Sequence, residues 1–112
     1  MIAASALPSR WWLVNKMVAR ESKFDAGRFA LISKALADPK RFEMLQRIAA
    51  SSQAPTCSCI RDWLQLAPAT ISHHLKELET AGLVSIEREG KFARITLRRD
   101  VLKAYTDRLA SI

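Results

Sequence analysis

The segment from Pro68 to Ala81 carries the side chains best suited to contacting another molecule. A helix turns about 100° per residue, so Ile71, Leu75 and Leu78 fall on one stripe, with the i, i+4, i+7 spacing of a core-facing surface. The opposite face carries small, hydroxyl, imidazole, ammonium and carboxylate groups at Ala69, Thr70, Ser72, His73, Lys76 and Glu77. Small side chains and hydroxyl, imidazole and ammonium groups suit contacts with base edges and phosphates in a major groove of DNA. An ordinary solvated face is the alternative for this helix taken alone.

The two neighbouring histidines of this segment are expected to differ. His73 projects away from the apolar stripe, whereas His74 lies beside Leu78 at the edge of that stripe. We therefore expect His74 to be packed and hydrogen-bonded in the structure of the domain. The pair is a poor metal site, because adjacent residues of a helix point about 100° apart.

Cys57 and Cys59 form the second candidate constellation. Thr56 is a helix cap in this pattern, and Cys57, Ile60 and Leu64 would share the inner stripe of the short helix that follows. Cysteine is often a small buried hydrophobe, while a thiol in a first helical turn has its pKa lowered. Two hypotheses stay open: a site for a thiophilic metalloid or metal ion, or a structural pair. The structural interpretation is the favoured one.

Helical elements upstream would position these residues. Apolar spacing predicts a helix from Gly27 to Ala37, and Asp38 followed by Pro39 is a cap and first-turn signature for the next. That second helix should end near Ser51 and carries an apolar face made by Phe42, Leu45, Ile48 and Ala49. The turn Leu66-Ala67-Pro68 leads into the helix from Pro68 to Ala81, which lacks a polar cap. Gly82 should end that helix.

A hairpin and a last helix complete the pattern. Val84 and Ile86 alternate with polar residues, Glu89-Gly90-Lys91 turns the chain, and Ala93, Ile95 and Leu97 form the returning inward set. The other face of the hairpin presents Phe92 and Arg94, with Arg88 and Lys91 beside its tip. A helix from about Arg99 to Ala110 follows. The expected fold is mainly α with a small β-hairpin wing (α+β), a winged helix-turn-helix.

Composition restricts the class of protein. The 112 residues give room for one domain, residues 27–112, and the net charge of +7 suggests a polyanionic partner. No apolar run reaches the length of a membrane span, and residues 1–26 lack the order of a signal peptide, so we expect a cytoplasmic protein whose cysteines are reduced. Residues 1–26 are an extension with two open interpretations: a helical docking arm containing Trp11 and Trp12, or upstream sequence before a true start at Met17.

Three local sequences together resemble the ArsR family of bacterial winged-helix repressors. They are ALADPKRFEML from Ala35, TISHHLKELETAGLV from Thr70 and REGKFARITL from Arg88, in the family's order over residues 27–110. The resemblance implies a homodimer joined through the first and last helices, bound to an inverted-repeat operator in double-stranded DNA and released by an effector. By the matching motifs, Ser72, His73, His74 and Lys76 fall on the family's recognition helix, and Arg88, Lys91 and Arg94 fall on its wing. With the outer face of the helix, the predicted DNA contacts are Ala69, Thr70, Ser72, His73, Lys76, Arg88, Lys91 and Arg94. The dimer contacts would be Phe29, Ile32, Leu36, Leu102, Tyr105 and Leu109.

The cysteines depart from the arsenic-sensing pattern of that family. Aligned on TISHHL, Cys57-Ser58-Cys59 falls one residue too far along, and the third cysteine of the best-known arsenic site is absent, with Arg61 and Asp62 in its neighbourhood. A rival hypothesis is a winged helix used for protein–protein contact without specific DNA binding. An enzyme is not expected, because the sequence has no nucleophile–base arrangement, glycine-rich phosphate loop or convincing carboxylate pair.

Overall fold

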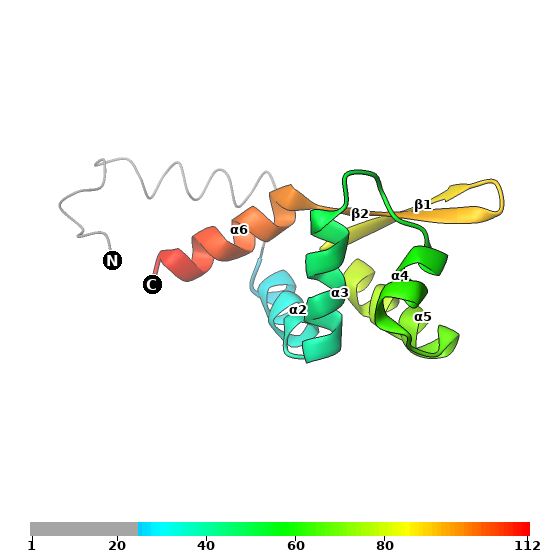
Figure 1. The fold of residues 1–112 in the computed structure, drawn as a ribbon. Helices are drawn as coiled ribbons and strands as arrows, with labels where there is room; N and C mark the ends of the chain where they lie inside the picture. The colour runs from blue at the N-terminus through cyan, green and yellow to red at the C-terminus, as the bar shows by residue number, and fades with distance from the viewer. Residues whose placement is uncertain (1–24) are drawn as a thin grey trace.

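A computed structural model describes residues 25–112. Its elements follow one another in the order α2 (Ala26–Leu36), α3 (Pro39–Ala50), α4 (Cys57–Leu64), α5 (Pro68–Thr80), β1 (Val84–Glu89), β2 (Phe92–Leu97) and α6 (Arg99–Ala110). The helices α2 to α5 form the body, while the hairpin and α6 extend from it in opposite directions (Figure 1). This is the winged helix-turn-helix predicted from the sequence.

The helix starts are set by local capping. Asp25 accepts a hydrogen bond from the backbone N–H of Arg28 at the start of α2, and Asp38 does the same for Arg41 at the start of α3. Such caps satisfy backbone donors that have no partner inside the helix. The hydrogen bond to Arg41 is also the main reason that the pKa of Asp38 is lowered. The cap at Asp38 was predicted, and α3 ends one residue before Ser51.

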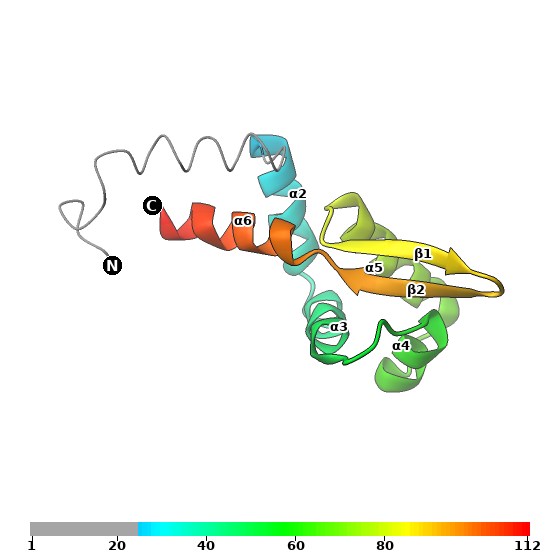
Figure 2. The ribbon, with the colours of Figure 1, turned by 90° about the horizontal axis from the view of Figure 1, so that it is seen from above.

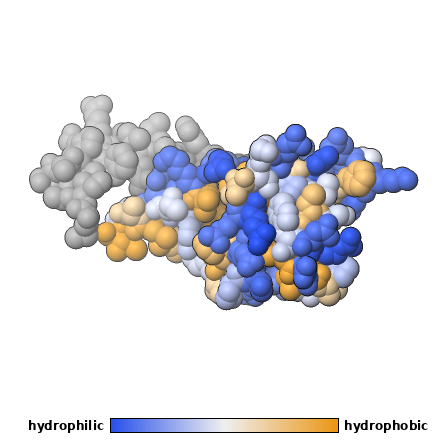
Figure 3. Space-filling model, in the orientation of Figure 1, coloured by the Kyte–Doolittle hydropathy of each residue, from blue (hydrophilic) through white to orange (hydrophobic). Residues whose placement is uncertain are grey.

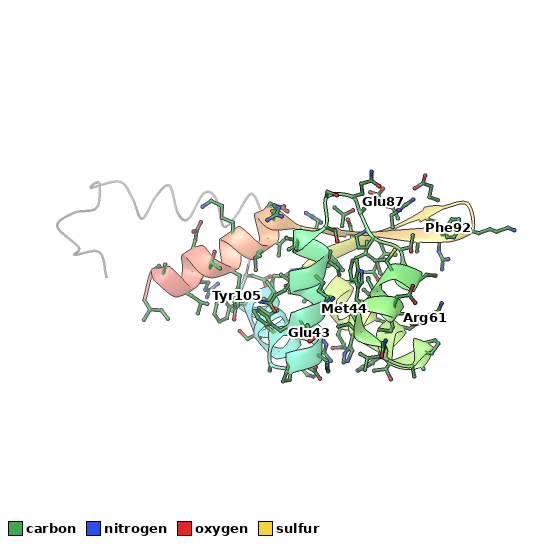
Figure 4. The ribbon with its side chains drawn as sticks, in the orientation of Figure 1. Glu43, Met44, Arg61, Glu87, Phe92 and Tyr105 are labelled. Atoms are coloured by element: carbon green, nitrogen blue, oxygen red, sulfur yellow. The ribbon has the colours of Figure 1, made fainter. Side chains whose placement is uncertain are left out.

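The hydrophobic core lies between the helical body and the base of the hairpin. Its fully buried side chains come from α2, α3, α4, α5, the turn after α5, and β2: Ile32, Met44, Ile60, Leu78, Leu83 and Ile95. Met44 is seen in the middle of this packing in Figure 4. Because α5 packs on α2, α3, α4 and β1, the core fixes its orientation relative to the wing.

Two predictions about inward faces were wrong. Phe42 is 44% exposed, and the buried stripe of α3 is made by Arg41, Met44, Leu45 and Ile48. Cys57 is also exposed, because it is the first residue of α4 and lies at an opening between α4 and α5 rather than in the core. Apolar periodicity assigned these positions, but it did not allow for a buried arginine in α3 or for the exposure of the first residue of α4.

The hairpin has the expected turn and alternating apolar residues. Val84 pairs with Leu97 and Ile86 with Ile95, so the alternating apolar residues share the face toward the body. Gly90, in the turn, has φ +61° and Gly82, at the end of α5, has φ +81°, values that glycine adopts without steric cost. None of the helices within residues 25–112 is long and apolar enough to span a membrane.

Candidate nucleic-acid interface

Helix α5 presents the predicted polar face to solvent. Ile71, His74, Leu75 and Leu78 are buried, whereas Ala69, Thr70, Ser72, His73 and Lys76 are all exposed. The helix begins with Pro68, and Ala67 before it supplies no side-chain cap. Its first backbone N–H groups are therefore left without a capping side chain, a situation in which they can donate to an anion such as phosphate.

His74 and Arg41 connect this helix to α3 inside the domain. Arg41 Nε donates to His74 Nδ1 at 3.3 Å, and Arg41 Nη1 donates to the carbonyl oxygen of Ala35 at 3.3 Å. Both side chains are at most 7% exposed. Burial lowers the pKa of His74, which agrees with a neutral ring whose Nδ1 accepts. The predicted structural role of His74 is confirmed.

His73 has the opposite environment on the same helix. It is exposed, and its ring centroid lies 6.0 Å from that of His74 at an interplanar angle of 47°. Its imidazole can therefore reach a ligand that His74 cannot. His74 therefore packs inside the domain, and His73 is available at its surface.

The wing places cationic and aromatic groups around its tip. Arg88, near the end of β1, and Lys91, in the turn, are exposed and lie on either side of Gly90. Phe92 is 57% exposed, and Figure 4 shows it on the outer part of the hairpin. The sequence placed Phe92 on the outer face but did not assign it to the candidate interface. Its exposure could have been suspected from its position beside the turn.

Arg94 differs from the other proposed phosphate contacts because its guanidinium is engaged within the protein. Arg94 Nη1 donates to the carbonyl oxygen of Ala54 at 3.0 Å, and Arg94 Nε donates to Glu89 Oε2 at 3.3 Å. Its side chain is 41% exposed. The first contact attaches β2 to the loop before α4, and the second joins β2 to β1 within the wing. Arg94 is therefore positioned to hold the wing, rather than extended toward solvent like Lys91.

The two thiols lie in different surroundings. Cys59 is half-buried, and its Sγ accepts a hydrogen bond from Thr56 Oγ1 at 3.3 Å, the main cause of a lowered pKa of the thiol. Cys57 is an exposed free thiol. Residues two apart on a regular helix point roughly 200° apart, so the two sulfurs do not converge on one ion. Among residues 25–112 no cluster of three or more His, Cys, Asp or Glu could hold a metal ion.

Helices α2 and α6 form an apolar surface on the opposite side of the body from the wing. The rings of Phe29 and Tyr105 lie 4.8 Å apart between centroids, and the Tyr105 hydroxyl shares a 3.0 Å hydrogen bond with Ser33. Figure 4 shows Tyr105 pointing from α6 toward α2. In Figure 3 apolar residues gather at the free end of α6, where Leu109 is 42% and Ile112 is 91% exposed.

The predicted dimer contacts divide into two groups. Phe29, Leu36, Leu102 and Tyr105 are partly buried and keep some apolar surface, and Leu109 is exposed. Ile32 is 0% exposed and belongs to the core of the protomer. A side chain without accessible surface cannot contact a second subunit, so the assignment of Ile32 to an interface was wrong.

Comparison with known proteins identifies relatives over much of this chain. A family described as "Helix-turn-helix domain" matches residues 36–87. Two uncharacterized HTH-type transcriptional regulators are similar in sequence. YceK of Bacillus subtilis is 28% identical over 76 residues, which are 68% of this chain and 76% of that protein. MJ1325 of Methanocaldococcus jannaschii is 41% identical over 61 residues, which are 54% of this chain and 67% of that protein.

Solved structures support the same assignment. An ArsR-like transcriptional regulator from Rhodococcus sp. RHA1 is 25% identical with a TM-score of 0.67, covering 76% of this chain and 78% of that one. A homodimeric winged helix-turn-helix DNA-binding domain from Mycobacterium bovis shares the fold, with a TM-score of 0.63 at 20% identity, over 99% of this chain and 89% of that one. The chain therefore belongs to the ArsR family of helix-turn-helix transcriptional regulators.

Proposed function

We propose that this protein is a transcriptional repressor that binds an inverted-repeat operator as a homodimer and leaves it when an effector binds. The observation that carries the proposal is the solvent-exposed face of α5, where Thr70, Ser72, His73 and Lys76 are covered by no other element of residues 25–112. Hydroxyl, imidazole and ammonium groups on one face of a helix match the donor and acceptor pattern of a major groove. Such a regulator would act in the cytoplasm.

The wing would supply contacts that do not depend on sequence. Arg88 and Lys91 are exposed cations at the tip, and cations at this position can pair with backbone phosphates beside the groove that α5 enters. Ala69 would allow close approach at the start of α5. Arg94 has its guanidinium bonded to Ala54 and Glu89, and in this proposal its main role is to position the wing.

The homodimer would form through the apolar surface of α2 and α6. Leu31, Leu109 and Ile112 are exposed there or next to it, and the relative from Mycobacterium bovis is described as a homodimer. A two-fold dimer presents two recognition helices with the symmetry of an inverted repeat. Leu109→Glu should shift the protein toward monomers in sedimentation and weaken DNA binding, whereas Thr106→Glu, an exposed change on the same helix, should do neither.

The division of roles on the DNA surface provides the test of function. Binding is measured by fluorescence anisotropy on a fragment selected from a random pool and on a scrambled fragment, at several salt concentrations. His73→Ala should cost about 1–3 kcal/mol on the selected fragment only. Lys91→Ala should weaken binding to both fragments and reduce the salt slope by about one unit per protomer. Equal losses on both fragments for both variants would contradict the roles, and no sequence preference at all would favour a protein–protein module.

A thiophilic effector at Cys57 and Cys59 has a separate test. If the thiols hold arsenite, they require a third donor and a local change of helix geometry, because they point apart on α4. We propose that they do not form the effector site. Arsenite added to the protein–DNA complex under reducing conditions should then leave the complex bound, and release that is abolished by Cys59→Ser would refute this.

A further inference from the structure

A pocket of about 290 Å³ lies where the wing meets the helical body. Its wall is formed by the loop of residues 51–55 between α3 and α4, by Cys59 and Trp63 of α4, and by Arg94 of β2. Seen from above, the loop leading into α4 lies close to β2 (Figure 2). The backbone holds the two together, because the N–H of Ile95 donates to the carbonyl oxygen of Pro55 at 2.9 Å. Here it is called the wing-base pocket.

The lining of the wing-base pocket favours one class of ligand. Among residues 25–112, Arg94 is the one charged residue that lines it, and the others are serine, glutamine, alanine, proline, cysteine and tryptophan. A guanidinium has five N–H donors, and the hydrogen bonds to Ala54 and Glu89 use two of those of Arg94. Trp63 is partly buried against the core and supplies an aromatic wall. A guanidinium beside an indole ring suits a ligand in which an anionic group is attached to an aromatic ring.

We propose that the wing-base pocket binds a small aromatic carboxylate, with the carboxylate on Arg94 and the ring against Trp63. A carboxylate can take two parallel N–H donors of one guanidinium, which gives both orientation and affinity. The volume of about 290 Å³ is at the lower end for ligand sites, so the ligand is a single-ring compound. For a ligand of about nine non-hydrogen atoms, the expected Kd is on the order of 1–10 mM.

Binding there would act on DNA through Glu89, a step that rests on the proposed function. Arg94 now pairs with Glu89, whose side chain is 72% exposed and directly precedes the turn of the wing. A carboxylate that draws the guanidinium into the pocket leaves Glu89 unpaired between Arg88 and Lys91. An unpaired negative charge beside the phosphates that these residues would contact lowers affinity for DNA. The ligand therefore acts as an effector that releases DNA.

Benzoate is the probe for this proposal, and benzamide is its neutral control of the same shape. Calorimetric titration of the full chain without DNA should show millimolar binding of benzoate and at least tenfold weaker binding of benzamide. Arg94→Met should abolish benzoate binding, whereas Arg88→Met removes one charge from the adjacent strand and should leave it unchanged. In the Cys57→Ser background, benzoate should also slow alkylation of Cys59 by iodoacetamide, a measurement that needs no change in the pocket.

The result on DNA separates this proposal from the proposed function. Saturating benzoate should weaken binding to the selected fragment about fivefold or more, a usual size for coupling between two sites. Glu89→Gln should reduce that effect while benzoate still binds. Equal binding of benzamide, retained binding in Arg94→Met, or no protection of Cys59 would overturn the pocket assignment. Benzoate that binds without changing DNA affinity would overturn the coupling, while a protein that binds benzoate but no DNA would refute the proposed function alone.

Discussion

Replacing each of the two adjacent histidines of α5 should affect different properties of the protein. His74→Ala removes the acceptor for Arg41 Nε, at 3.3 Å, from a site where both residues are at most 7% exposed. His73→Ala removes an exposed ring from the face that we propose to contact DNA. The same substitution at neighbouring positions therefore tests whether the packing side and the binding side of α5 are assigned correctly.

The expected loss of stability for His74→Ala follows from two effects. A buried donor left without an acceptor costs about 1–3 kcal/mol, and truncating a buried ring leaves a cavity that costs roughly another 1–2 kcal/mol. The sum, about 2–5 kcal/mol, is a large part of the roughly 5–15 kcal/mol that stabilises a typical domain. His73→Ala should change stability by less than about 0.5 kcal/mol.

Urea unfolding followed by circular dichroism measures both losses at one pH, and anisotropy at low temperature measures DNA binding of the folded protein. His74→Ala should lower the urea midpoint strongly, and His73→Ala should leave it unchanged while losing preference for the selected fragment. His74→Gln, whose amide oxygen can accept from Arg41, should recover part of the stability. Equal urea midpoints for the two alanine variants would refute the reasoning about the buried pair.

Three further predictions concern groups that support the interface. Burial lowers the pKa of His74 in the folded state, so the contribution of this residue to stability is complete above about pH 6.5 and is lost as the pH falls below that value. The free energy of unfolding should then fall by at most about 1.4 kcal/mol per pH unit, and the urea midpoints of His74→Gln should lack this part of the pH dependence. Thr56→Ala should destabilise α4 by about 1 kcal/mol and raise the pKa of the Cys59 thiol, measured as the pH dependence of iodoacetamide alkylation, with Thr56→Ser retaining both properties. Gly82→Ala should lower the free energy of unfolding by at least about 1–2 kcal/mol in urea, because φ is +81° and the added methyl group would meet the guanidinium of Arg28. Arg28→Ala would remove this steric conflict but not the strain of the positive φ.

Local signals were sufficient for the order and limits of the elements. Asp38 followed by Pro39 identified the start of α3, and the last helix was expected over the range in which α6 lies. Alternation at Val84, Ile86, Ile95 and Leu97 predicted the inward face of the hairpin, and the observed pairing puts these residues opposite one another. These features depend on caps, turns and periodicity within a few residues, so they can be recognised without knowing the packing of distant segments.

Features that depend on distant contacts were missed or assigned wrongly. Arg41 was not expected inside, because its burial depends on acceptors from α2 and α5, 6 and 33 positions away in the chain. The hydrogen bond from Arg94, a predicted DNA contact, to the loop carbonyl of Ala54 was not expected either, because it spans 40 positions. Periodicity placed Phe42 and Cys57 inside, although neither is buried. Polarity patterns describe a single helix or strand and do not say which partner satisfies a buried charge.

We propose that two copies of this chain bind one operator, each through its helix α5. Fragments that the purified full chain selects from a random pool should share an inverted repeat with half-site centres about 10 base pairs apart, one turn of DNA. Sedimentation of the complex should give two protomers per duplex. A His73→Ala protein taken through the same selection should return a changed consensus at positions within each half-site. Selected fragments without a common sequence, or a single protomer bound to each duplex, would contradict the claim.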